Sequence, residues 1–324
     1  MIKNWGELSK IQFNNILLGN GFSRTYWNKF EYRSLLEMCG DEPVGRYLCT
    51  KEIFKKLNTE NFEEVLRAVY HAYIVSIDNQ DAIKTLYLGI RKSLIVSVKN
   101  VHPKPSDIPN NKIGKCLSDY GSVFTTNYDL LPYWASLDGY SDKFVDYFWG
   151  DGIFNLANTV VFPGKVPIHY LHGALHLQSN NISDARKVSI KIESGVEEAI
   201  NLQFVNSYPL FITEGRSALK ISRIRGNSYL NFCYEKLCLS KGGLVVYGHD
   251  LNPEYEEHIV EAIRQSQNEE IAIGVFSLLS ATKKEVFAAK VSDQLDGLGK
   301  KVHFFETETH PLSRCNESQF GQVR

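Results

Sequence analysis

Short apolar runs alternate with helical patterns along the chain. Six runs rich in β-branched and aromatic residues are bounded by turn-forming residues, and we interpret them as buried strands. They cover residues 16–18, 122–125, 168–171, 244–247, 271–276 and 302–305. Runs this short are not long enough for hydrophobic periodicity to distinguish a strand from a buried helix. Their composition and the turns that follow them favour strands.

Between these runs, apolar residues recur at helical spacing. Two helices are expected to begin at caps, one at Asn61 and one at Asn252–Pro253. Two others are expected to end before His102–Pro103 and before Gly297, and a fifth covers residues 219–237. Strand and helix alternate over the C-terminal part of the chain. This alternation predicts a parallel sheet with right-handed crossovers, and therefore an α/β fold.

The spacing of the runs predicts one large domain over residues 1–324 with two insertions. About a hundred residues separate the first strand from the next, too many for one crossover, and much of this stretch has helical periodicity. We therefore expect mainly helical insertions over residues 26–110 and 178–240, packed together as a cap over the sheet.

The charge balance and the lengths of the apolar runs exclude several classes of protein. The chain has 36 Lys and Arg against 37 Asp and Glu, a net charge of −1, so we expect no direct binding to nucleic acid. No apolar run reaches the roughly 18 residues that a membrane span needs. Residues 1–7 carry no apolar signal segment, and we expect a cytoplasmic protein without a membrane partner.

The cysteines and histidines do not predict a metal site. None of the six cysteines forms a C-x2-C pair, which favours reduced, mostly buried thiols. His172 and His176 are four residues apart, but Gly173 at a strand end argues against a helical ligand pair. We therefore expect no bound metal.

Polar turns follow four of the expected strands, at the edge where open α/β sheets bind ligands. The first turn is Gly-Asn-Gly-Phe-Ser at residues 19–23, where glycine allows the backbone N–H groups to approach a pyrophosphate. A tight turn with a purely structural role fits this segment equally well. It also lacks the third glycine of the dinucleotide fingerprint.

The other three turns carry the remaining candidate chemistry. Thr126–Asp129 offers an amide and a carboxylate, although either Asn127 or Asp129 could simply cap the next helix. His172 beside Gly173 is suited to general-base work, with a packing role as the alternative. Gly248 and His249 follow the fourth strand, either next to a nucleotide or in an ordinary strand–helix loop.

The order of these four turns resembles the sirtuin family, and in particular the sirtuin-like NADases of bacterial anti-phage defence. The resemblance rests on Gly-x-Gly-x-Ser, Thr-Thr-Asn-Tyr-Asp, Leu-His-Gly and a later strand that ends in Gly-x-Asp. It covers some 35 residues. It implies a Rossmann-like parallel sheet of sirtuin-type topology with helical insertions, without the zinc subdomain, because the two C-x2-C pairs of deacylase sirtuins are absent.

The resemblance also implies the roles of individual residues. Asn127 and His172 become the catalytic pair, with Asn127 orienting the attacking water and His172 acting near the ribose hydroxyls. The residues expected to bind NAD+, the substrate, are Gly19, Asn20, Gly21, Phe22, Ser23, Arg33, Thr126, Asp129, Gly248 and His249. Thr126 departs from the family, since it stands where a Gln usually precedes the Asn.

The function implied is an NAD+ glycohydrolase that releases nicotinamide and ADP-ribose and depletes NAD in anti-phage defence. Its activity would be controlled by assembly, as a homo-oligomer or with a HerA-like hexameric ATPase. One alternative is a non-catalytic sensor or scaffold that binds ADP-ribose or a related nucleotide. NAD-dependent deacylation is a further alternative, which the missing zinc cysteines disfavour.

Overall fold

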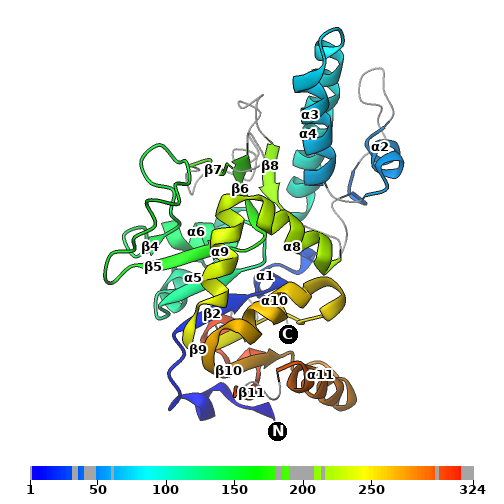
Figure 1. Cartoon of the computed structure of the whole chain (residues 1–324). Coiled ribbons are helices and arrows are strands. Elements are labelled where there is room, and N and C mark those ends of the chain that lie inside the picture. Colours follow the sequence, from blue (N-terminus) through cyan, green and yellow to red (C-terminus); the bar gives the residue numbers. More distant parts are fainter. Residues whose placement is uncertain are drawn as a thin grey trace.

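A computed structural model describes residues 2–30, 36–39, 49–59, 62–179, 184–189, 208–212, 216–295 and 299–314. Within these residues, eight strands form one sheet and three form a second, smaller sheet (Figure 1). All strand pairs of the large sheet are parallel, and helices flank it. The predicted α/β fold with a parallel, Rossmann-like sheet is confirmed.

All six predicted strands lie in the large sheet. In spatial order its strands are β1 (Ile2–Lys3), β11 (Lys301–Glu306), β10 (Gln267–Val275), β9 (Lys241–Tyr247), β2 (Asn15–Leu18), β3 (Ser122–Thr125), β5 (Val166–Tyr170) and β4 (Phe144–Val145). The central strands are buried on both faces, which is why they appear in the sequence as unbroken apolar runs. From β2 the chain moves first to β3 and later returns to β9 on the other side. The sheet therefore has a topological switch point between β2 and β9.

Helices follow most of these strands and pack on the sheet. They are α1 (Asn20–Tyr26), α5 (Asn110–Leu117), α6 (Leu131–Leu137), α10 (Pro253–Gln265), α11 (Ala281–Leu295) and α12 (Pro311–Arg314). The predicted start of α10 is confirmed, since the Asn252 side chain accepts a hydrogen bond from the Glu254 amide and Pro253 occupies the first helical position.

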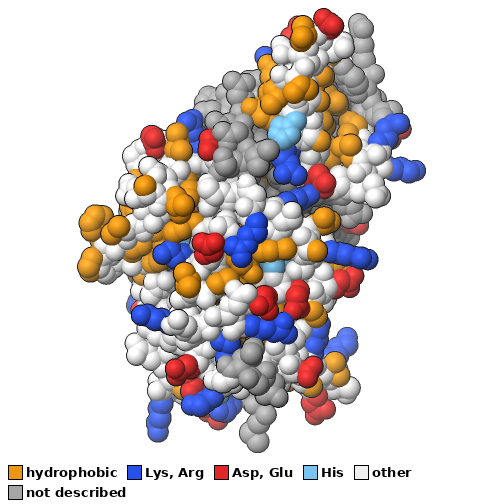
Figure 2. Space-filling view, in the orientation of Figure 1, with side chains coloured by type: hydrophobic (Ala, Val, Ile, Leu, Met, Phe, Trp, Pro, Cys, Tyr) orange, Lys and Arg blue, Asp and Glu red, His pale blue; other side chains and the backbone are white. Residues whose placement is uncertain are grey.

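Residues 26–110 contain α2 (Thr50–Leu57), α3 (Phe62–Val75) and α4 (Gln80–Val101). The predicted end of a helix before Pro103 is confirmed, because α4 stops with His102 in an extended conformation. Helices α3 and α4 form a hairpin that stands out from the body (Figure 1). Near its tip Val75 and Ile77 are 77% and 91% exposed. Figure 2 shows hydrophobic side chains gathered over this hairpin and again at the left edge of the view, with charges of both signs intermingled between and below them.

The segment 178–240 contains strands as well as helices. Its strands β7 (Arg186–Lys187) and β8 (Tyr208–Phe211) flank β6 (Gly173–Ser179) in the small antiparallel sheet. The prediction of one helix over residues 219–237 is wrong: α8 (Ser217–Gly226) and α9 (Ser228–Cys238) meet at Asn227. Asn227 has an extended backbone, and its side-chain oxygen accepts the amides of Tyr229 and Leu230, which caps α9.

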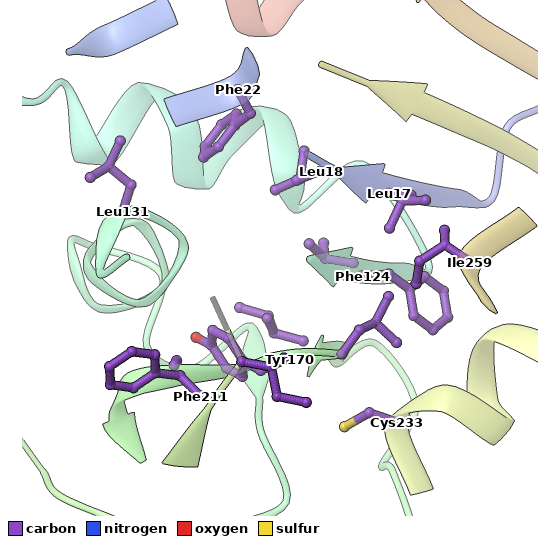
Figure 3. Packing of buried hydrophobic residues seen from close by; sticks show 14 of the residues in the cluster. Leu17, Leu18, Phe22, Phe124, Leu131, Tyr170, Phe211, Cys233 and Ile259 are labelled. Carbon is purple, nitrogen blue, oxygen red and sulfur yellow. The ribbon is translucent and has the colours of Figure 1, made fainter. Parts of the chain in front are cut away.

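The core lies between the sheet and the helices on its faces. Figure 3 shows strand residues such as Leu17 and Phe124 packed near Cys233 of α9 and Ile259 of α10. All four are at most 1% exposed. The five described cysteines are free, but only Cys39 and Cys233 are buried, so the expectation of mostly buried thiols is wrong for this part of the chain. No helix within the described residues is both long and apolar enough to cross a membrane.

Candidate functional site

The four predicted turns lie at the same edge of the sheet, on the neighbouring strands β9, β2, β3 and β5. This edge holds the carboxyl ends of parallel strands, and it includes the switch point between β2 and β9. Hydrogen bonds connect the turns directly. Gly21 N donates to Gly248 O at 2.7 Å, and Asn127 Nδ2 donates to Gly19 O at 2.9 Å.

The glycines of the first turn are required by contact with the fourth turn. A Cβ at Gly19 would lie 2.5 Å from Gly248 O, and a Cβ at Gly21 would lie 2.7 Å from Gly248 Cα. Gly248 has φ of +69°, and a Cβ there would collide with the Phe22 amide. The close backbone approach that glycine permits here is therefore between two protein turns.

The expected binding of a diphosphate by this turn stays a prediction, although three of its backbone amides make hydrogen bonds within the protein. Gly19 N donates to Tyr247 O, Gly21 N to Gly248 O and Phe22 N to Gly19 O. These three groups already have partners within the protein. Phe22 itself is fully buried in the core, and the Asn20 side chain donates to Phe30 O at 3.2 Å.

Asn127 is held rigidly through both protons of its side-chain amide. Nδ2 donates to Gly19 O at 2.9 Å and to Ser23 Oγ at 2.8 Å, and the Asn127 amide donates to Thr125 Oγ1. The side chain does not cap a helix, which was the alternative from the sequence. Within the described residues its Oδ1 has no hydrogen bond, so this acceptor is left to orient a water or a ligand hydroxyl.

Ser23 and Asp129 hold Asn127 in place through a chain of hydrogen bonds. Ser23 Oγ donates to Asp129 Oδ2 at 2.5 Å, and Asp129 Oδ1 accepts the Leu131 amide at the start of α6. Both side chains are buried. Burial raises the pKa of Asp129 to about 6, opposed by the hydrogen bonds from Ser23 and Leu131. The structure therefore gives both residues internal partners, including the helix-capping bond that was the alternative for Asp129.

His172 follows β5 at the point where the chain turns into β6. Gly173 makes this turn possible, since its φ is +73° and a Cβ would collide with the Leu210 carbonyl. His172 is buried, with its side chain 3% exposed. Burial, and then the positive charge of Lys220, hold the pKa of His172 well below its usual range, although a hydrogen bond to the Thr126 backbone opposes them. The ring is therefore neutral at pH 7.

Helices α8 and α10 surround His172 with polar groups that the sequence did not single out. His258 Nε2 lies 2.8 Å from His172 Nε2, and Ser217 Oγ lies 2.9 Å from His258 Nδ1. One oxygen of Glu256, Oε2, lies 3.7 Å from both ring nitrogens and 4.0 Å from His249 Nε2. We call His172, Glu256 and His258 the histidine–glutamate cluster.

No local signal in the sequence marks these added residues. Glu256 and His258 belong to an amphipathic helix whose apolar face explains its fold, and Lys220 resembles an ordinary helix charge. In the structure Lys220 Nζ is paired with Glu256 Oε1 at 2.5 Å, and its side chain is 6% exposed. A buried ion pair next to neutral histidines is typical of a functional site, but only the packing of α8 on α10 assembles it.

The remaining predicted site residues are Thr126, Gly248, His249 and Arg33, and His176 was considered only as a metal ligand and rejected. Thr126 and Gly248 are partly exposed at the sheet edge, and His249 is buried with its Nδ1 accepting the Leu251 amide. His176 lies apart from the histidine–glutamate cluster, stacked on Tyr133. Arg33 lies outside the described residues.

A comparison with curated proteins finds no match to this chain. The sequence profile of one family, described as a domain of unknown function (DUF4917), matches residues 16–312. The match spans the large sheet from β2 to β11 and includes all four turns and the histidine–glutamate cluster. The chain therefore belongs to the DUF4917 family.

Proposed function

We propose that this protein is a sirtuin-like NAD+ glycohydrolase, with Asn127 and His172 as its catalytic pair. One observation carries the proposal: the sheet brings a rigidly held amide with a free acceptor and a neutral histidine to one edge, beside the switch point. Ligands of open α/β sheets bind at this kind of place. The resemblance to sirtuins supplies the substrate.

For hydrolysis of NAD+, the main task of the protein is to orient the water and the ribose. The bond between the nicotinamide nitrogen and the ribose breaks, and its electron pair neutralises the pyridinium, so that nicotinamide leaves uncharged. Water forms the new bond to the anomeric carbon through a transition state with oxocarbenium character. Asn127 Oδ1 accepts a hydrogen bond from this water. His172, neutral at pH 7, takes up the proton that the water loses.

The test is nicotinamide release from NAD+ by the purified protein. Asn127→Ala and His172→Ala should each lower kcat by roughly 10²–10⁴-fold, the range for general-base and positioning groups, with little change in KM. Both residues are buried and bonded, so thermal melting must show that each variant is folded.

Matched controls exist for both substitutions. Asn110 is buried and its side chain donates to Pro105 O, and His310 is buried and bonded to Tyr120. Neither residue belongs to the four turns or to the histidine–glutamate cluster. Asn110→Ala and His310→Ala should lose stability without the specific loss of kcat. Full turnover by folded His172→Ala would refute the proposed base.

The control of activity is part of the same proposal. We expect a homo-oligomer, possible partners including a HerA-like hexameric ATPase, and a role in anti-phage defence through NAD depletion. The exposed apolar tip of the α3–α4 hairpin, with Ile74, Val75 and Ile77, is a candidate contact surface. The assay is therefore run with and without such an ATPase. Tight nucleotide binding without turnover in either state would favour the nucleotide sensor instead.

A further inference from the structure

The three ligand-type atoms of the histidine–glutamate cluster form a compact triangle. His172 Nε2 and His258 Nε2 are 2.8 Å apart, and Glu256 Oε2 is 3.7 Å from each of them. Glu256 Oε2 is buried and has no hydrogen-bond donor among the described residues. A buried carboxylate oxygen that faces two histidine nitrogens without any bond calls for a missing partner.

The dimensions of the triangle fit a metal ion. The point in their plane that is equidistant from the three atoms lies about 2.0 Å from each, close to Zn–N and Zn–O bond lengths of about 2.0–2.2 Å. The two histidine nitrogens share a hydrogen bond in the metal-free protein, and tetrahedral coordination would move them apart to about 3.3 Å. We propose that His172, Glu256 and His258 bind a divalent transition metal of the Zn²⁺ class. Two histidines and one glutamate leave a fourth position open, the ligand set of an accessible rather than a closed structural zinc site.

The groups behind the ligands orient them for this purpose. The hydrogen bond between His172 and the Thr126 backbone favours a ring proton on the nitrogen away from the cluster, which leaves Nε2 as an acceptor. Ser217 Oγ holds His258 through Nδ1 and likewise leaves its Nε2 facing the cluster. Such outer bonds are usual for histidines that bind metals.

Glu256 is also directed into the cluster by its own backbone. It has non-helical dihedrals, φ of −132° and ψ of 20°, in the first turns of α10. Lys220 occupies the other oxygen, Oε1, and so leaves Oε2 to face the rings. The Lys220 charge lowers the affinity for a cation below that of a free carboxylate, and we expect reversible rather than permanent binding.

The metal would affect the proposed hydrolysis, and this consequence rests on the proposed function. A metal bound to His172 Nε2 takes the lone pair that the base role needs. The metal-bound protein should therefore hydrolyse NAD+ more slowly than the metal-free protein. The metal site itself does not depend on hydrolysis, because its three ligands and their geometry are independent of any substrate.

The experiment titrates Zn²⁺ into the full-length protein after removal of metals by a chelator, without NAD+. Calorimetry should show one site per chain, and Co²⁺ in its place should give the visible absorption of a nitrogen- and oxygen-ligated ion. Glu256→Gln preserves the shape and the contact with Lys220, and should weaken binding at least tenfold. His258→Ala should do the same, and melting curves test whether each variant is folded.

His303→Ala is the matched control, because His303 Nε2 lies 2.6 Å from Glu270 in a two-residue pair elsewhere. Its affinity for Zn²⁺ should equal that of the wild type. Absence of binding, or binding that survives Glu256→Gln in a folded protein, would overturn the metal site. Assays of hydrolysis with chelator present test the proposed function separately, so either proposal can fail while the other stands.

Discussion

The buried carboxyl of Asp129 gives a pH dependence that can be calculated from the structure. Its pKa is raised from 3.8 to about 6 by burial, while the bonds from Ser23 and Leu131 oppose the shift. The folded protein therefore holds the Asp129 proton more tightly than the unfolded chain. A shift of roughly two pKa units corresponds to roughly 3 kcal/mol between the two protonation states.

The sign follows from this difference in proton binding. Between pH about 4 and 6 the folded state binds more protons than the unfolded state, so the free energy of unfolding falls as pH rises. The contribution of protonated Asp129 is complete below pH 4 and is lost as pH passes through its pKa of about 6. Above that pH the contribution no longer changes.

Asp129→Asn isolates this contribution. Asn keeps an acceptor for the Leu131 amide and offers an N–H to Ser23 Oγ, whose own proton loses the Asp129 acceptor. That loss does not depend on pH, so it shifts the whole curve and leaves the pH-dependent difference readable. Relative to the wild type, the variant should gain roughly 3 kcal/mol in free energy of unfolding between pH 4 and pH 7. Urea unfolding at a series of pH values measures the difference.

Asp250→Asn is the matched control for this series. Asp250 accepts the amide two residues ahead, as Asp129 does, but its side chain is exposed beyond β9. The prediction fails if the free energies of unfolding of Asp129→Asn and of the wild type change in parallel from pH 4 to pH 7. In that case the Asp129 carboxyl is not in the buried environment described here, and it does not support Asn127 through Ser23 in the way the structure indicates.

Three further substitutions test the local geometry through thermal melting. Gly21→Val should lower the Tm, because its Cβ would lie 2.7 Å from Gly248 Cα; loss of binding with an unchanged Tm would contradict the turn-to-turn packing. Gly173→Ala should also destabilise, since φ is +73° and the Leu210 carbonyl blocks the Cβ; a neutral effect would show that the turn relaxes easily. Asn227→Ala should cost about 1 kcal/mol by removing the cap of α9, and an unchanged Tm would mean that the cap contributes nothing.

The strands and their order along the chain could be predicted because the central strands are buried on both faces. Parallel strands of this kind appear as apolar runs that end in turn residues, and Ser122–Thr125 was predicted to the residue. The two-residue strands β1 and β4 carry no such pattern. The break between α8 and α9 had a local signal, since Gly226 precedes the capping Asn227, but the continuous apolar pattern concealed it.

The sequence predicts the residues of the candidate site that follow strands, but not those that lie on helices, and the reason is physical. Asn127 and His172 end strands, and the position of a strand end follows from the sheet alone. His258 lies 86 residues beyond His172, and Ser217 lies 41 residues before His258. Contacts of this range depend on how helices pack on each other, and the helical pattern of α8 and α10 does not determine that packing.

The two residues of the proposed catalytic pair are therefore held in place by different parts of the fold. Asn127 is fixed by turns that follow the central strands, through Gly19 and Ser23. His172 instead faces side chains from α8 and α10, and α8 belongs to the inserted segment that the four turns do not include. The turns that carry the resemblance to sirtuins lie at one edge of the sheet, but the charge and hydrogen bonding of His172 are set by Ser217, Lys220 and their partners on α10. The proposed chemistry thus depends on the inserted segment as much as on the sheet.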